Sequence, residues 1–155
     1  MRTLKASFYS CIIMLAIAVP GIIKAQHISR PVNNTGHIVF MEDAWTKALR
    51  QAKIQNKYIF VDAYATWCGP CKMLKATTFR NDKAAVFYNN NFINVAIDME
   101  KGQGPALAQQ WQLTAYPTLI IFDSNGKPVL GSVGYIKADD LIRFGKQALG
   151  NNKSR

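Results

Sequence analysis

The chain has 155 residues, of which 49% are hydrophobic, and this length and composition predict one globular domain with a substantial core. Its formal net charge is +10 at pH 7. The Lys and Arg residues are scattered rather than clustered, and no aromatic residues alternate with them, so we expect no nucleic-acid binding.

The N-terminus has the features of a secretory signal peptide. Arg2 begins a charged start, an apolar stretch covers residues 6–19, and Pro20 ends it. This stretch is shorter than the roughly 20 apolar residues of a membrane-spanning helix. We therefore expect a signal peptide over 1–25, cleaved after Ala25, and export to the periplasm or out of the cell. An uncleaved N-terminal membrane anchor is the alternative.

The remaining chain is expected to hold a linker at 26–37, a folded domain at 38–149 and a flexible basic tail at 150–155. Strand and helix patterns alternate along the domain. The predicted helices cover 44–52 with Asp43 as the cap, the segment from the cysteines to about 77, and then 82–90, 105–111 and 138–149; the predicted strands cover 58–64, 92–98, 118–122 and 128–133. This order predicts an α/β fold, a three-layer α/β/α sandwich with a mixed central sheet.

Cys68 and Cys71 form the candidate reactive site. Cys11 falls in the predicted signal peptide, so these two are the only cysteines of the exported chain and its only possible intramolecular pair. They directly follow an apolar strand, and Pro70 suits the first turn of a helix. Cys68 is thus expected at a helix N-terminus, where the dipole and free N–H groups favour a thiolate. Three positions on, Cys71 returns to the same face, close enough for a disulfide.

This placement predicts a cycle of thiol-disulfide exchange. The Cys68 thiolate would attack a substrate disulfide, and Cys71 would then resolve the mixed disulfide. The same steps in reverse would oxidise a substrate dithiol. A static disulfide is the structural alternative. A metal site would need two further ligands, and the sequence holds no second pair of cysteines or paired histidines to supply them.

The segment 61–72, VDAYATWCGPCK, resembles the active-site segment of the thioredoxin family. Asp62, six residues before the first cysteine, and the run Tyr116-Pro117-Thr118 also stand at the family's positions. The resemblance implies a thioredoxin-like fold whose redox cysteine pair needs no other cofactor. It also implies that Asp62 is a buried base for Cys71, acting through water.

The resemblance further implies a substrate-binding surface around the cysteines. Pro117 would be a cis proline opposite the disulfide, leaving nearby backbone free to pair with an extended peptide. The residues expected to contact substrate are Trp67, Gly69, Pro70, Tyr116, Pro117 and Thr118. One departure is Asn94, which stands where many thioredoxins carry a lysine near the buried aspartate. Without that cation we expect Asp62 to be harder to ionise.

The segments 77–79 and 98–102 are similar to the periplasmic thioredoxin-like domain of the membrane thiol-disulfide interchange protein. We therefore expect a monomeric enzyme that reduces or isomerises disulfides of exported proteins. A membrane or envelope thiol reductase is the expected electron donor. A net disulfide oxidase and a non-catalytic peptide-binding module with idle cysteines remain the alternatives.

Overall fold

The computed structural model describes residues 35–150. The predicted signal peptide, Cys11, most of the linker and nearly all of the predicted tail lie outside the described residues. Gly150, which we assigned to the tail, is the last residue of a helix. Among the helices at 35–150, none combines the length and the apolar character needed to cross a bilayer.

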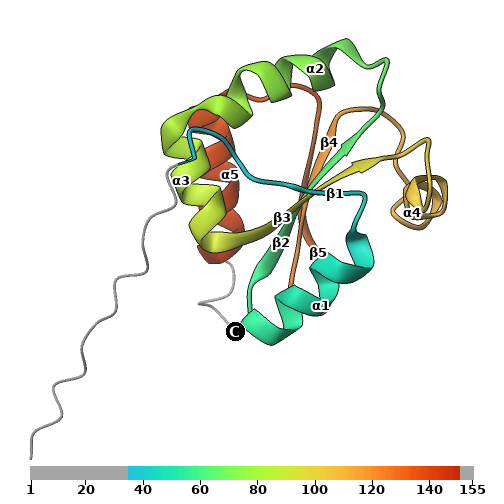
Figure 1. Cartoon of the computed structure of the whole chain (residues 1–155), viewed down its shortest axis with the longest axis horizontal. Helices are drawn as coiled ribbons and strands as arrows, with labels where there is room; N and C mark the ends of the chain where they lie inside the picture. The colour runs from blue at the N-terminus through green and yellow to red at the C-terminus, as the bar shows by residue number, and fades with distance from the viewer. Residues whose placement is uncertain (1–34, 151–155) are drawn as a thin grey trace, which may run out of the picture. The chain divides into compact units, whose positions relative to one another are not determined.

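A five-stranded mixed sheet forms the centre of the domain, with the strands in the order β1-β3-β2-β4-β5 (Figure 1). Their bounds are β1 (Met41–Glu42), β2 (Tyr58–Tyr64), β3 (Phe92–Asp98), β4 (Thr118–Phe122) and β5 (Pro128–Val133). Strand β3 pairs in parallel with β1 and β2, whereas the β2–β4 and β4–β5 pairs are antiparallel. A register irregularity interrupts the last pair near Phe122.

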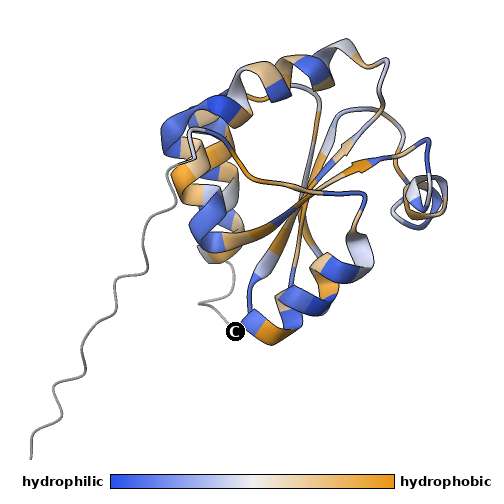
Figure 2. Cartoon of the chain, viewed as in Figure 1, coloured by the Kyte–Doolittle hydropathy of each residue, from blue (hydrophilic) through white to orange (hydrophobic). Residues whose placement is uncertain are grey.

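Helices cover both faces of this sheet, which confirms the predicted α/β sandwich. In Figure 1, α2, α3 and α5 lie on one face, and α1 and α4 lie on the other. The bounds are α1 (Trp45–Gln55), α2 (Gly69–Ala76), the 3-10 turn η1 (Thr78–Arg80), α3 (Asp82–Asn91), α4 (Gly104–Gln110) and α5 (Ala138–Gly150). The hydropathy colours show mostly apolar strands in the centre and helices in which polar and apolar residues alternate (Figure 2).

Strand β2 supplies side chains to two separate cores. Phe60 packs in the core beneath α2, α3 and α5, while its neighbours Ile59 and Val61 pack in the core beneath α1 and α4. Successive side chains of a strand point to opposite faces. Asp62 therefore lies on the same face as Phe60, in the layer that α2 covers.

The predicted helix cap at Asp43 is wrong. The residue before α1 is Ala44, which makes no side-chain cap hydrogen bond. Asp43 instead takes a left-handed backbone, φ 48°, and its Oδ1 accepts a hydrogen bond from the backbone N–H of Asp98 at 2.8 Å. A short acidic side chain can satisfy any nearby backbone donor, and here the end of β3 lies within reach.

Strand β1 and the turn η1 were not predicted. Two residues are too few to show the alternation by which a strand is recognised. Pairing with β3 nevertheless places Glu42 level with Ala96.

Gly104 begins α4 where the helix crosses close to the backbone that follows β3. A Cβ at this position would collide with the carbonyl oxygen of Asp98 and lie 2.7 Å from Cα of Met99. We expect Gly104→Ala to lower the free energy of unfolding by about 2–3 kcal/mol, since backbone atoms cannot yield as a side chain can. Urea denaturation measures the change.

Gly131→Ala is the matched control, because a Cβ there would meet nothing nearer than 3.9 Å. We expect this variant to differ little from the parent. If both variants lost the same free energy of unfolding, the close approach of α4 to Asp98 would not be the cause of the loss.

Candidate active site

Cys68 and Cys71 are joined by a disulfide at the start of α2, with their Cα atoms 5.3 Å apart. The chain leaves β2 at Tyr64 and enters the helix at Gly69, so Cys68 takes the N-cap position with an extended backbone. Its Sγ accepts a hydrogen bond from the backbone N–H of Cys71 at 3.2 Å. Once the disulfide is reduced, this N–H and the helix dipole would stabilise a Cys68 thiolate.

Both cysteines are buried in this oxidised form, Cys68 being 2% exposed and Cys71 1% exposed. They pack in a small cluster with Ala65, against which Tyr64 and Tyr116 also pack. Gly69 and Pro70, between the cysteines, are exposed.

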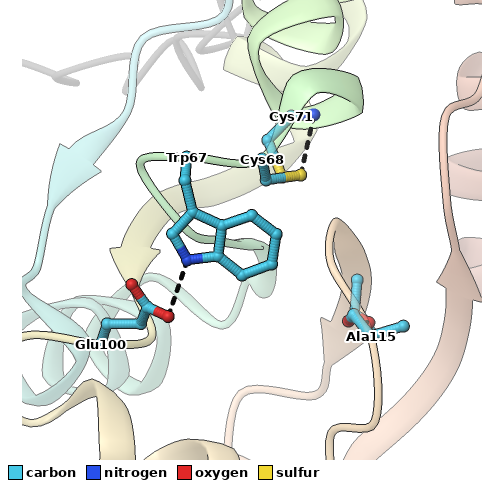
Figure 3. Close-up of a disulfide and its surroundings, with 6 residues drawn as sticks. Trp67, Cys68, Cys71, Glu100 and Ala115 are labelled. Carbon is cyan, nitrogen blue, oxygen red and sulfur yellow. Dashed lines mark hydrogen bonds between the residues drawn. A yellow bond between two sulfur atoms is a disulfide. The ribbon is translucent and has the colours of Figure 1, made fainter.

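Trp67 presents its indole beside the disulfide and is 66% exposed. Figure 3 shows the indole directed at Glu100, whose Oε1 accepts a hydrogen bond from Nε1 at 2.8 Å. The indole also meets the ring of Tyr116 edge-on, with the centroids 6.3 Å apart. The sequence analysis missed Glu100. The available signal was its place just after β3, because parallel strands β2 and β3 end at the same edge of the sheet.

The loop before β4 completes the surroundings of the disulfide. The Tyr116–Pro117 peptide bond is cis. Thr118 is buried, and its hydroxyl donates a hydrogen bond to the carbonyl of Ala115 at 2.7 Å, so its side chain holds the loop rather than facing outward. The carbonyl of Pro117 accepts from the backbone N–H of Gly134 at 2.8 Å, which ties the loop to the end of β5.

Asp62 is a fully buried carboxyl group on β2. It is 0% exposed, and neither side-chain oxygen has a hydrogen-bond partner. Burial raises the pKa of Asp62 to about 7; the positive charge of Lys75 lowers it and the negative charge of Glu42 raises it. Asp62 can therefore change its charge near neutral pH.

Asn94 supplies no charge near this carboxyl group. It lies level with Phe60, and its side-chain N–H groups donate to the carbonyl of Val39 at 3.3 Å and to Oδ1 of Asn89 at 3.2 Å. The cation that acts on Asp62 comes instead from α2. This cation is Lys75. It follows Cys71 by four positions, which places both on one helix face, and this spacing in the sequence could have pointed to Lys75.

The residues at 35–150 hold no cluster of three or more His, Cys, Asp or Glu side chains placed to bind a metal ion. The Asp98 carboxylate, at the end of β3, pairs instead with Lys101, Oδ2 to Nζ, at 2.9 Å. Hydrogen bonding from Lys101 lowers the pKa of Asp98.

The buried Asp62 predicts a pH-dependent stability. Its pKa is about 7 in the folded chain against an ordinary 3.8, so between these values the folded state keeps a proton that the unfolded state loses. Stability should therefore fall as pH rises through this window and level off above it. Asp62→Asn removes this loss, so we expect its advantage over the parent to grow by roughly 2–4 kcal/mol from pH 4 to pH 8.

Urea denaturation of the disulfide form at several pH values measures this difference. Asp139→Asn, which changes an exposed carboxylate on α5, is the control and should follow the parent at every pH. If the free energy of unfolding of the parent changed with pH in the same way as that of Asp62→Asn, Asp62 would have no raised pKa in the folded chain.

Comparison with known proteins places this site in a family. The family described as a thioredoxin-like domain matches residues 45–149. A thioredoxin of Chlamydia trachomatis is 38% identical over 91 residues, covering 59% of this chain and 82% of its own. The thiol:disulfide interchange protein DsbD of Tatumella citrea is 27% identical over 130 residues, which cover 82% of this chain but 22% of that protein.

Solved structures of thiol-disulfide proteins are also similar to this chain. A Bacteroides thetaiotaomicron protein proposed to be a disulphide-isomerase superposes with a TM-score of 0.65 at 38% identity, covering 73% of this chain and 93% of its own. The DsbH oxidoreductase, at 19% identity, shares the fold with a TM-score of 0.64 over 79% of this chain and 90% of its own. The chain belongs to the thioredoxin-like family and is a thiol-disulfide oxidoreductase whose redox-active pair is Cys68 and Cys71.

Proposed function

We propose that the chain reduces or isomerises disulfides in exported proteins. The observation that carries this proposal is the disulfide at the N-terminus of α2, flanked by the exposed indole of Trp67 and the cis Tyr116–Pro117 bond. A site of this shape offers a redox sulfur pair beside an apolar surface that a peptide can cover. Export is supported by the signal-like N-terminal sequence.

The reducing half of the cycle begins with the Cys68 thiolate. It attacks one sulfur of the substrate disulfide, and the other substrate sulfur leaves as a thiolate that takes up a proton. Cys71 then loses its proton to Asp62 through a water molecule and attacks Sγ of Cys68. The second substrate sulfur leaves, and the Cys68–Cys71 disulfide forms. Two electrons thus pass from the cysteine pair to the substrate.

A substrate peptide would lie between the cysteine turn and the loop before β4. Gly69 and Pro70 are exposed on one side, and Tyr116 packs against the cysteine cluster on the other. Because Pro117 and Thr118 are buried, their contribution is the backbone of the loop, which an extended peptide can join by strand addition. Trp67 would cover the apolar side chains of that peptide.

Each turnover leaves the pair oxidised, so an external thiol donor must return two electrons. We assign this role to a membrane or envelope thiol reductase. The similarity to DsbD supports this assignment, because that relative is a thiol:disulfide interchange protein. This chain spans about a fifth of the length of that relative. We propose that the chain acts as a monomer without a further cofactor.

Cys71→Ser should trap substrates, because the mixed disulfide on Cys68 loses the thiol that resolves it. We expect this variant, produced in its host, to carry mixed disulfides with proteins of the cell envelope. Non-reducing electrophoresis followed by mass spectrometry identifies them.

Cys68→Ser is the matched control and should trap no substrate and reduce no insulin. If the host grew normally with Cys68→Ser in place of the parent chain, the role of the chain would not need disulfide exchange, and the chain would be a peptide-binding module. Trapped proteins confined to the cytoplasm would contradict export.

The reduction potential of the cysteine pair decides the direction of exchange. We expect a value near the roughly −270 mV of thioredoxin, measured by equilibration with glutathione or dithiothreitol buffers. A value near about −120 mV, typical of strong oxidants, would make the chain a net oxidase instead.

A further inference from the structure

Asp62 belongs to a row of three residues that crosses the sheet. Asp62 on β2 is level with Ala96 on β3, and Ala96 is level with Glu42 on β1. All three strands are parallel, so these side chains point to the same face, the one beneath α2. Neighbouring strands lie about 4.8 Å apart, which puts the backbones of the two acidic residues roughly 10 Å apart. Ala96, the middle member of the row, contributes a side chain of a single methyl group.

An open groove of about 640 Å³ lies beside this row, between the segment containing β1 and the helices α2 and η1. Glu42 and Lys75 both line it, together with the apolar side chains of Phe40 and Phe79. Both charged residues are exposed, whereas Asp62 is fully buried. The groove therefore brings two solvent-accessible charges of opposite sign close to a buried carboxyl group.

Lys75 is held in this position by an aromatic ring. Its Nζ lies 3.5 Å from the centroid of Tyr64, a cation–π contact. Tyr64 is two residues after Asp62 on β2, so both side chains are on the same face. Tyr64 also packs against the cluster that contains Cys68 and Cys71. The contact thus places the ammonium group over a ring that itself packs against the cysteine cluster.

The other groups around Asp62 contribute less charge. Leu119, level with it on β4, is apolar, and Asn94 on β3 is neutral. Asp98, further along β3, is neutralised by its ion pair with Lys101. On α2, the buried residues are Cys71 and Leu74, and neither carries a charge in the disulfide form. Lys75 and Glu42 are the two charges that act on Asp62 most strongly, in opposite directions.

We propose that Lys75 and Glu42 are positioning residues that set the protonation of Asp62 from opposite walls of the groove, Lys75 favouring the carboxylate and Glu42 favouring the acid. In the reduced enzyme, Cys71 gives its proton to the Asp62 carboxylate and becomes a thiolate, and Asp62 later returns that proton to water. Lys75 keeps Asp62 able to accept the proton near neutral pH. This inference rests on the proposed role of Asp62 toward Cys71.

The test follows the Asp62 carboxyl carbon directly by ¹³C NMR in the oxidised chain, with Asp62→Asn to assign the signal. We expect the titration midpoint to rise in Lys75→Met and to fall in Glu42→Gln, with the double variant between the two. Lys75→Arg keeps the charge and should restore the parent midpoint. Lys83→Met, which removes an exposed charge from α3, is the control and should leave the midpoint unchanged.

Activity gives the second readout. In Lys75→Met we expect the release of a mixed disulfide by Cys71 to slow by roughly two- to five-fold at pH 7 and to recover at higher pH. A structural role for Lys75 would lower the rate equally at every pH. Midpoints that stay at the parent value, or that move equally in Lys83→Met, would overturn the proposal. The NMR titration needs no turnover, so a failure of the proposed reductase activity would be seen separately in the insulin assay.

Discussion

Strand β2 has neighbours on every side: β3 and β4 pair with its two edges, and separate cores cover its two faces. A strand held in this way has no freedom to shift its register, because a slip by one residue would exchange the contents of the two cores. Cys68 follows the end of this strand after a short turn. The position of the reactive sulfur is therefore fixed by the best-buried part of the protein.

The same burial makes the carboxyl group of Asp62 costly to ionise. Asp62 occupies a place in β2 that an apolar residue would fill at lower cost, and its two oxygens have no hydrogen-bond partner within the described structure. A carboxyl group in such a place stays protonated up to a pH where an exposed one is long ionised. Ionisation of Asp62 near neutral pH is therefore expected to lower the stability of the folded protein.

Much of the fold could be predicted from the sequence. The apolar run at 58–64 and the hairpin strands around 118–133 show their structure locally, and the order of elements leads to the sandwich. The cysteine site was equally visible, since its motif is continuous in sequence. The structure was needed for β1, for the contact between Trp67 and Glu100, and for the charges around Asp62. The first two depend on segments more than 30 residues apart that carry no periodic signal, and Glu42 is brought into the row of Asp62 only through the pairing of β1 with β3. Export, oligomeric state and the residue roles remain predictions.

The two edge strands of the sheet, β1 and β5, are poor templates for strands of other chains. Strand β1 has only two residues, and β5 starts with a proline and pairs irregularly with β4. A long, flat, unpaired edge invites other chains to add strands and to aggregate, whereas short, proline-bearing or irregular edges discourage this. The short β1 and the proline-bearing, irregular β5 therefore offer few places at which a strand of another chain could add.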